Sequence, residues 1–504
     1  MVRQLFAWGV LALSATTAHA DWSEASSDHF IIYSDQSEKS LRPFAERLEL
    51  FHAMMAQVLR KEPPKPSPSN RVTIYVVSSE TEVQNLIKAR NSIVSGIYRA
   101  RAGATVALVP QLRHARSDLD LAPETILYHE YAHHFMAGIT ARAYPRWFVE
   151  GFAEFFSGVR FRSGKVNLGM PANHRLLELE FSTHLPIREL LSYAGNSREP
   201  KSRYDAFYGD SWALFHFLQF APERAGQLGR YQALLGQGQS ALGAAQGAFG
   251  DLDQLDKEVL LYWKRGYMNH VVIEQSTLKI GSIGVSKVSP GLAAMMSIAI
   301  RSELGLSKEE AASLLADAQH VAARFPEDAE VLTVLAAVEL AAGNDDAAIA
   351  TADRAIAISP DRVDAQLQKG FALFQKVESG ALPKESWAWV RSQFAKANTI
   401  EHDHPIPLIE FYRSYLVQGA QPTKNAIDGL AWAMQLAPFD PSVRWMVSQE
   451  LIADGRLADA AEVLAPLAYS PHRNELTDQA LKALQEVQAR IAREQAPPDP
   501  AGTP

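Results

Sequence analysis

The chain has 504 residues, of which 47% are hydrophobic and 21% are charged, and at roughly 150 residues per domain this length predicts about three globular domains. The 57 acidic and 49 basic residues give a formal charge of −8, so no general positive charge would attract nucleic acid, and we expect no nucleic-acid partner. Cysteine is absent, which excludes disulfides, thiolate metal sites and cysteine nucleophiles.

Residues 1–20 have the layout of a secretory signal peptide. Arg3 precedes a nine-residue apolar run, and small residues then lead to an A-x-A cleavage site that ends at Ala20. We therefore expect an exported protein, periplasmic or secreted, whose mature chain begins near Asp21; the alternative is an uncleaved N-terminal anchor. No later stretch reaches 18 apolar residues, so we expect no membrane span after the signal is removed.

The front half reads as strands first and helices afterwards. Runs of β-branched and aromatic residues predict strands over 29–34 and 71–78, and a hairpin over 92–110. Four prolines between residues 61 and 70 predict a loop. Apolar residues at helical spacing predict helices over 40–60, 80–89, 123–137, 146–156, 187–194, 205–220 and 251–268. This order indicates an α+β fold.

The back half, from about residue 290, is rich in Ala, Leu and Glu and has no strand signals. The interval from Pro326 to Pro360 equals the period of a tetratricopeptide repeat (TPR), about 34 residues, and a Gly343-Asn344 turn lies between them. This pattern resembles a TPR unit, and a second unit covers 441–471. The spacings of about 42 and about 36 residues between these units indicate degenerate repeats with insertions. We predict an all-α TPR-like solenoid whose groove binds a protein partner; an irregular helical bundle is the alternative.

The strongest chemical signal is His129-Glu130-x-x-His133 in the predicted helix 123–137. Two histidines four residues apart project from one helix face, where both can bind one Zn²⁺. Glu130 is then placed to act as general base for a zinc-activated water. The apolar helix 146–156 carries Glu150 and Glu154 on one face, and a cation would explain buried carboxylates there. Solvated or core histidines are the alternative.

The HEYAH helix followed by W-x-x-E-G-x-A-E resembles the gluzincin zinc metallopeptidases. More narrowly, an exported chain with TPR-like repeats after the site is similar to the peptidase-MA-like bacterial proteins. The resemblance implies His129, His133 and Glu150 as zinc ligands and Glu130 as the catalytic base. It also implies that Glu154 orients a ligand imidazole.

Further features bear on the substrate. Residues 208–218 match the Y-x-x-S-W pattern of the same family, which implies Tyr208 as a donor to the oxyanion. The segment between His133 and Glu150 is shorter than in the aminopeptidases of that family, and no segment for binding a free amino terminus is found, so endo- and exopeptidase activity both stay open. A peptide would bind along an edge strand, for which 103–109 is the candidate.

The predicted fold class is an α+β zincin-like catalytic domain, with a mixed or antiparallel sheet and active-site helices, followed by an all-α TPR-like solenoid. The predicted segments are a signal peptide (1–20), a metallopeptidase core (21–160), a helical second part with linker (161–290), TPR-like repeats with a capping helix (291–493) and a disordered tail (494–504). The predicted function is zinc-dependent hydrolysis of peptides or proteins. Alternatives are a scaffold with an inactive zincin-like domain, or hydrolysis of a non-peptide substrate.

The remaining histidines are expected to be structural. His216 lies in an apolar helix and is predicted to be a core residue, and His134 is predicted to face away from the metal. The turn 402–404 (His-Asp-His) offers a weak second metal site. Four arginines near the hairpin are expected to form a solvated face or, alternatively, to attract an acidic substrate: Arg99, Arg101, Arg113 and Arg116.

Overall fold

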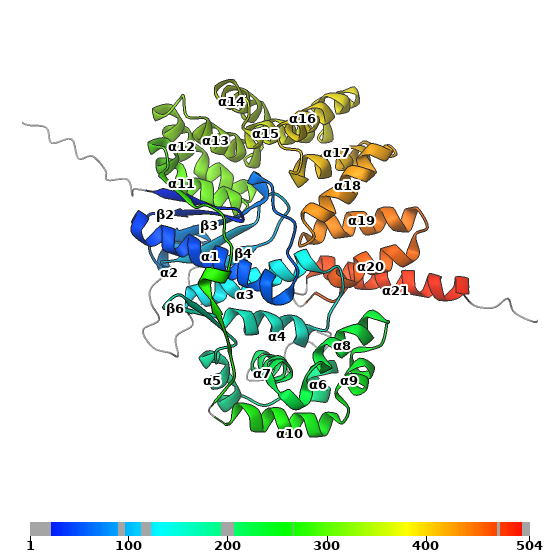
Figure 1. Cartoon of the computed structure of the whole chain (residues 1–504). Helices are drawn as coiled ribbons and strands as arrows, with labels where there is room; N and C mark the ends of the chain where they lie inside the picture. The colour runs from blue at the N-terminus through cyan, green and yellow to red at the C-terminus, as the bar shows by residue number, and fades with distance from the viewer. Residues whose placement is uncertain are drawn as a thin grey trace, which may run out of the picture.

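The structure is a computed structural model that describes residues 22–88, 96–111, 122–192, 206–265, 267–470 and 474–495. The predicted signal peptide lies outside these residues, and so does the predicted tail, except that residues 494 and 495 are the last two of a helix. Figure 1 shows a central β-sheet with helices on its faces, a helical lobe below it, and an arc of helices that begins near residue 290.

A six-stranded mixed sheet forms the centre, in the order β4-β5-β3-β2-β1-β9. β2, β3 and β5 run parallel, whereas β1, β4 and β9 are antiparallel to their neighbours. The strands are β1 (Ser23–Ser26), β2 (Phe30–Ser34), β3 (Val72–Val77), β4 (Ile97–Arg99), β5 (Val106–Pro110) and β9 (Gly284–Lys287). The strands predicted from β-branched and aromatic runs are confirmed, and the polar strand β1 was missed because its pairing with β2, and not its composition, makes it a strand.

The predicted substrate-binding strand 103–109 is wrong. β5 pairs with β3 on one side and with β4 on the other, and all its residues are buried. β4 is therefore the strand at this edge of the sheet. The hairpin itself was predicted, but hydrogen bonds to β3 from a distant part of the sequence decide which of its strands is the edge.

Helices cover both faces of the sheet. On one face, β2 and β3 form a single core with α1 (Glu38–Leu59), α3 (Pro123–Ile139) and α4 (Arg146–Ser157). On the other face, Tyr75, Val77 and Leu108 pack against α2 (Glu80–Leu86) and α11 (Pro290–Glu303). Helix α11, assigned to the repeats from the sequence, is therefore also a layer of the front part, so the predicted boundary at residue 290 falls within a shared core.

The segment 161–290, predicted to be helical, also contains strands. β6 (Arg160–Arg162), β7 (Lys165–Leu168) and β8 (Val271–Glu274) form a second sheet, and β9 returns to the central one. β6 and β7 form a local hairpin that the sequence analysis missed, whereas β8 and β9 pair with strands far along the chain. All four strands are very short, so their local pattern is weak. The lobe helices are α5 (Asn173–Phe181), α6 (Ile187–Ser192), α7 (Phe207–Phe220), α8 (Gln227–Gly236), α9 (Ala241–Phe249) and α10 (Leu252–Trp263).

The back half consists of successive helix pairs joined by short turns, as TPR-like repeats are. The first helices of the later units begin at positions 329, 363, 405, 441 and 475, so the first and last intervals equal the predicted period and the two between them are longer. The helices after α11 are α12 (Lys308–Arg324), α13 (Ala329–Ala341), α14 (Asp345–Ile358), α15 (Val363–Glu378), α16 (Trp387–Ile400), α17 (Pro405–Gln418), α18 (Lys424–Leu436), α19 (Pro441–Ala453), α20 (Leu457–Ala468) and α21 (Glu475–Gln495).

The repeat architecture follows from small buried residues. Ala348, Ala352 and Ala355 of α14 have no exposed surface, which lets α14 approach α13 and α15 closely. No helix in the described part of the chain has the length and apolar composition needed to cross a bilayer.

The arc of repeats bends back onto the front part of the molecule. It passes over the sheet and descends beside α3, where α19 and α20 lie (Figure 1). Hydrogen bonds fix this position: Ala102 N donates to Asp440 Oδ2 (2.8 Å), and Asn70 Nδ2 donates to the carbonyl of Leu436 (2.9 Å). The end of the solenoid is thereby placed next to the helix that carries the His-Glu-x-x-His motif.

Candidate metal centre

Helices α3 and α4 position the predicted ligands. Pro123 begins α3, where its missing N–H costs nothing. One face of α3 enters the core through Leu127, Tyr131 and Phe135, so the remaining face presents the motif residues to α4. Helix α4 is buried along nearly its whole length, which places its two carboxylates inside the protein.

The three predicted ligands lie together. His129 Nε2 and His133 Nε2 are 3.0 Å apart, and Glu150 Oε2 lies 3.4 Å and 3.5 Å from them. The two imidazole rings stand almost perpendicular, at 84°. A single ion can therefore lie in the plane of both rings, with the carboxylate as third ligand. Two His nitrogens and one carboxylate with an open fourth position are a ligand set of catalytic zinc.

Glu150 gives an independent test of this fit. Its side chain is 1% exposed, and neither of its oxygens accepts a hydrogen bond from the described residues. Burial raises the pKa of this carboxyl, but the neighbouring imidazoles of His129 and His133 outweigh burial and lower the pKa. A buried carboxylate without hydrogen bonds requires a cation beside it. The residues present therefore fit a divalent metal.

Glu154 lies behind His129, as predicted. Its side chain is 2% exposed, and Oε1 lies 3.1 Å from His129 Nδ1 and accepts a hydrogen bond from Arg175 Nη2 (2.6 Å). A carboxylate at Nδ1 fixes the proton there and leaves Nε2 available to bind a metal. Arg175 was missed from the sequence, because it follows α4 in the next helix without any motif to mark it.

Glu130 and Tyr208 flank the ligand group. Glu130 lines a cleft together with His133 and is not one of the three ligands. Tyr208 lies in the first turn of α7, with its ring 4.9 Å from the guanidinium of Arg175. Burial and the charge of Glu150 raise the pKa of Tyr208, so its hydroxyl keeps the proton that a donor needs.

The cleft lies between helices α3 and α4 and the end of the repeats. Its volume is about 320 Å³, within the size range of ligand sites. On one side are Glu130, His133 and the edge strand residue Tyr98; on the other are Phe439 of the repeats and residues of α19 and α20. The repeats thus form a wall of the cleft, which the sequence did not indicate.

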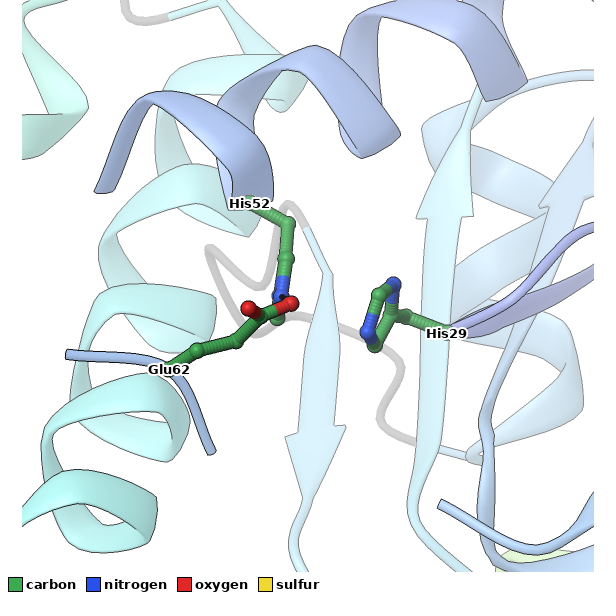
Figure 2. A group of neighbouring side chains, drawn as sticks. All are labelled: His29, His52 and Glu62. Carbon is green, nitrogen blue, oxygen red and sulfur yellow. Dashed lines mark ion pairs between the residues drawn. The ribbon is translucent and has the colours of Figure 1, made fainter. Parts of the chain in front are cut away.

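A second group of potential ligands, His29, His52 and Glu62, has a different geometry. Figure 2 shows the two imidazoles face to face; their centroids are 3.6 Å apart and their planes 21° apart. Two nearly parallel ring planes intersect only far from the rings. A single ion therefore cannot lie in the plane of both imidazoles. Burial and the neighbouring His29 lower the pKa of His52 to about 3, which keeps its imidazole neutral. We therefore assign this pair a structural role.

The expectations for other histidines are met in the described residues. The imidazole of His134 stacks on the ring of Tyr131, with 5.6 Å between the ring centroids, and its centroid lies 4.0 Å from that of Phe439. His134 is therefore outside the group of candidate ligands. In the 402–404 turn, the buried His404 caps α17 by accepting a hydrogen bond from Ile406 N, and no metal cluster forms there. The second metal site is therefore not supported.

Of the four arginines that were expected to form a solvated face, Arg99 and Arg101 lie in the described part of the chain. Arg99 donates a hydrogen bond to the carbonyl of Leu304 in the repeat half, so this guanidinium anchors two parts of the chain together. Arg101 also lies close to the repeats, near Gly305. Arg113 and Arg116 lie outside the described residues.

His216 is a core histidine, as predicted, and its protonation state follows from its partners. Nε2 lies 2.8 Å from the carbonyl of Gly169, which only accepts, so Nε2 carries the proton. Nδ1 lies 2.9 Å from the hydroxyl of Tyr262 and accepts from it. Burial lowers the pKa of His216 to about 4.

We expect His216→Gln to reduce the acid sensitivity of the fold. The neutral imidazole stabilises the folded state above its ordinary pKa of 6.5, and this contribution is lost as the pH falls toward about 4. Between about pH 7 and about pH 5 the loss amounts to about 2 kcal/mol in the parent chain and is absent in the variant. Urea unfolding at both pH values measures it; equal pH dependence in both chains would contradict this assignment.

No protein-family model matches the sequence, and no curated protein matches it. Among solved structures, the chain is similar to a thermophilic TPR protein of Thermus thermophilus, TTC0263, at 18% identity and a TM-score of 0.33, covering 39% of this chain and 99% of that one. It is also similar to MamA, at 13% identity and a TM-score of 0.25, covering 37% of this chain and 92% of MamA. These neighbours are TPR-like proteins, and they give no evidence of a gluzincin domain in this chain.

Proposed function

We propose that this protein is a zinc-dependent peptidase whose metal is held by His129, His133 and Glu150. The observation that carries the proposal is the buried Glu150 carboxylate, which accepts no hydrogen bond from any residue that the structure describes and lies against the Nε2 atoms of two nearly perpendicular imidazoles. Glu130, which is not a ligand, faces the adjoining cleft. These are the parts needed for metal-assisted hydrolysis.

The protein residues have distinct tasks in this proposal. The bound zinc would polarise the scissile carbonyl and activate water. Glu130 takes a proton from the attacking water and delivers it to the leaving amine. Tyr208 donates a hydrogen bond to the carbonyl oxygen as negative charge develops on it. Glu154 holds the ring of His129 in place, and Arg175 neutralises Glu154.

Peptide is the substrate class that the fold supports best. The edge strand β4 contributes Tyr98 to the cleft that contains Glu130. An extended peptide can pair with such an edge through main-chain hydrogen bonds, beside the general base. We propose an exported location on the signal pattern of residues 1–20.

A protein-binding scaffold is the second candidate function. The TPR-like helices form a long array, and arrays of this kind present a concave surface for peptides or partner helices. In this case the front domain would be a structural module, and the metal residues would serve stability. The similar solved structures described above are of the repeat class, so peptidase activity rests on the site geometry alone.

Metal content separates the two functions. We expect one zinc ion per chain in the purified mature protein by elemental analysis, and none in His133→Ala, because two ligands do not retain the ion against a chelator. His270→Ala is the matched control, since His270 is exposed and belongs to no ligand group in the described residues. Parent protein that stays free of zinc after metal is offered would favour the scaffold.

A further inference from the structure

Arg444 is a buried arginine at the far wall of the cleft. It lies in the first turn of α19 and lines the same cleft as Glu130 and His133, although it belongs to the last part of the repeats and they belong to the front domain. Its side chain is only 7% exposed. A guanidinium remains charged in proteins, so this position brings a fixed positive charge to the proposed substrate site.

Among the residues that the structure describes, no carboxylate pairs with Arg444. Its one side-chain hydrogen bond runs from Nε to the carbonyl of Pro438 (2.7 Å), and no ion pair joins it to any described acidic residue. Asp440, its nearest acid in sequence, is otherwise engaged: Oδ1 caps α19, accepting from Ser442 N (2.7 Å), and Oδ2 accepts from Ala102 N (2.8 Å).

Arg224, which is also buried, and the partly buried Arg175 differ in this respect. Arg224 pairs with Glu258 at 2.6 Å, and Arg175 pairs with Glu154 at 2.6 Å. The carboxylates outweigh burial and raise the pKa of Arg175, whereas burial lowers the pKa of Arg444 with no opposing charge. Burying a cation without a partner carries a large free-energy cost, so such a residue is retained where a ligand supplies the anion.

The charge of the cleft agrees with an anionic ligand. Glu130 is the one acidic residue among the described residues that line it, and Arg142 adds a second positive charge. The chain as a whole carries a formal charge of −8, so this positive lining is a local feature. A cleft with a surplus of positive charge on partly apolar walls selects anions.

We propose that Arg444 binds a carboxylate of the peptide substrate, and thereby sets its specificity from the repeat domain. The planar guanidinium offers two parallel N–H groups to the two oxygens of a carboxylate. The carboxylate is either the free C-terminus of the peptide or an Asp or Glu side chain. This inference rests on the proposed peptidase function, because it places the peptide in the cleft of Glu130.

Binding and hydrolysis are measured separately so that the two proposals can fail independently. Zinc-loaded full-length Glu130→Gln protein is titrated with dye-labelled peptides, and binding is followed by fluorescence anisotropy without cleavage. The peptides form matched sets: free C-terminus against C-terminal amide, and internal Glu against Gln. Parent enzyme is assayed for hydrolysis with the same sets.

We expect a peptide with the recognised carboxylate to bind more tightly than its neutral counterpart, and Arg444→Gln in the same background to remove this preference. The expected loss is on the order of 10- to 100-fold in affinity, the range for hydrogen bonds to charged groups. The neutral peptides should bind both proteins equally. Compared with Arg444→Gln, Arg444→Lys should restore part of the preference, because lysine keeps the positive charge but lacks the two parallel N–H groups of the guanidinium. Arg490→Gln, at an exposed arginine of α21, is the control.

The peptide sets also identify the carboxylate. A preference that disappears with the C-terminal amide assigns the free C-terminus, whereas one that disappears with internal Gln assigns an acidic side chain. Equal binding of charged and neutral peptides by the parent background would overturn the inference, even if hydrolysis is observed. Carboxylate-dependent binding lost in Arg444→Gln would uphold it, even if the enzyme assay shows no cleavage and the peptidase proposal fails.

A stability measurement tests whether weaker peptide binding by Arg444→Gln results from a change in the fold. Because no carboxylate in the described part of the chain pairs with Arg444, Arg444→Gln should unfold at the same temperature as the parent or higher. A lower unfolding temperature, with all peptides weakened alike, would show a structural role and contradict the proposal.

Discussion

Glu130→Gln is expected to retain its zinc and to lose peptide hydrolysis. Glu130 lies between the two proposed ligand histidines in sequence but is not among the three proposed ligands, and it lines the cleft. An amide cannot accept the proton of the attacking water, so the rate should fall on the order of 10²- to 10⁴-fold. Elemental analysis and turnover of a peptide substrate, both on the same preparation, measure the two effects.

Glu124→Gln provides the matched control on the same helix. Glu124 pairs with Arg47 in the first turn of α3, away from the ligands, so this change should lower stability slightly and leave turnover intact. Full activity of Glu130→Gln would show that the general base is another group. Loss of zinc from it would instead show that Glu130 supports the metal.

The sequence predicts those parts of the site that depend on one helix. His129 and His133 are brought together by the helical repeat alone, and the same spacing predicts that Glu150 and Glu154 share a face of the next helix. The pairing of these two helices was inferred from the need to partner a buried carboxylate. Each inference requires only local geometry or the chemistry of a single residue type.

Arg175 and Arg444 were not predicted, for a physical reason. Each gains its role through tertiary packing: Arg175 reaches Glu154 from α5, and Arg444 reaches the cleft from a helix near the other end of the chain. Arginine is common on exposed helices, so an arginine in the sequence does not by itself indicate a role in a site. The edge strand was misassigned similarly, because hydrogen bonds to β3 decide whether β4 or β5 lies outside.

In the repeat half, too, local features were predicted from the sequence and features that depend on tertiary packing were not. The repeat period and the insertions are local features, and the helix positions agree with them. The curvature that brings α19 against the front domain is the sum of small rotations between successive pairs. It depends on contacts such as the hydrogen bond from Ala102 N to Asp440, which no repeat pattern specifies.

Gly151→Ala is expected to cause a large loss of both stability and zinc. Gly151 follows Glu150 and lies where α4 crosses α7; a Cβ there would come 2.5 Å from the carbonyl oxygen of Ser211 and 3.0 Å from Cβ of Phe215. The carbonyl belongs to the backbone of α7, so the helices must separate. Overpacking of this kind costs on the order of 3 kcal/mol. Separation also shifts Glu150 away from the two histidines.

Gly229→Ala is the control for the intrinsic effect of adding a methyl group to a helix. Gly229 lies in α8, and a Cβ there meets no atom within 4 Å, so the change should stabilise the protein by up to about 1 kcal/mol. Urea unfolding and zinc content of both variants separate packing from helix propensity. If Gly151→Ala retained parent stability and zinc, the close crossing of α4 and α7 would not be what holds Glu150 at the metal.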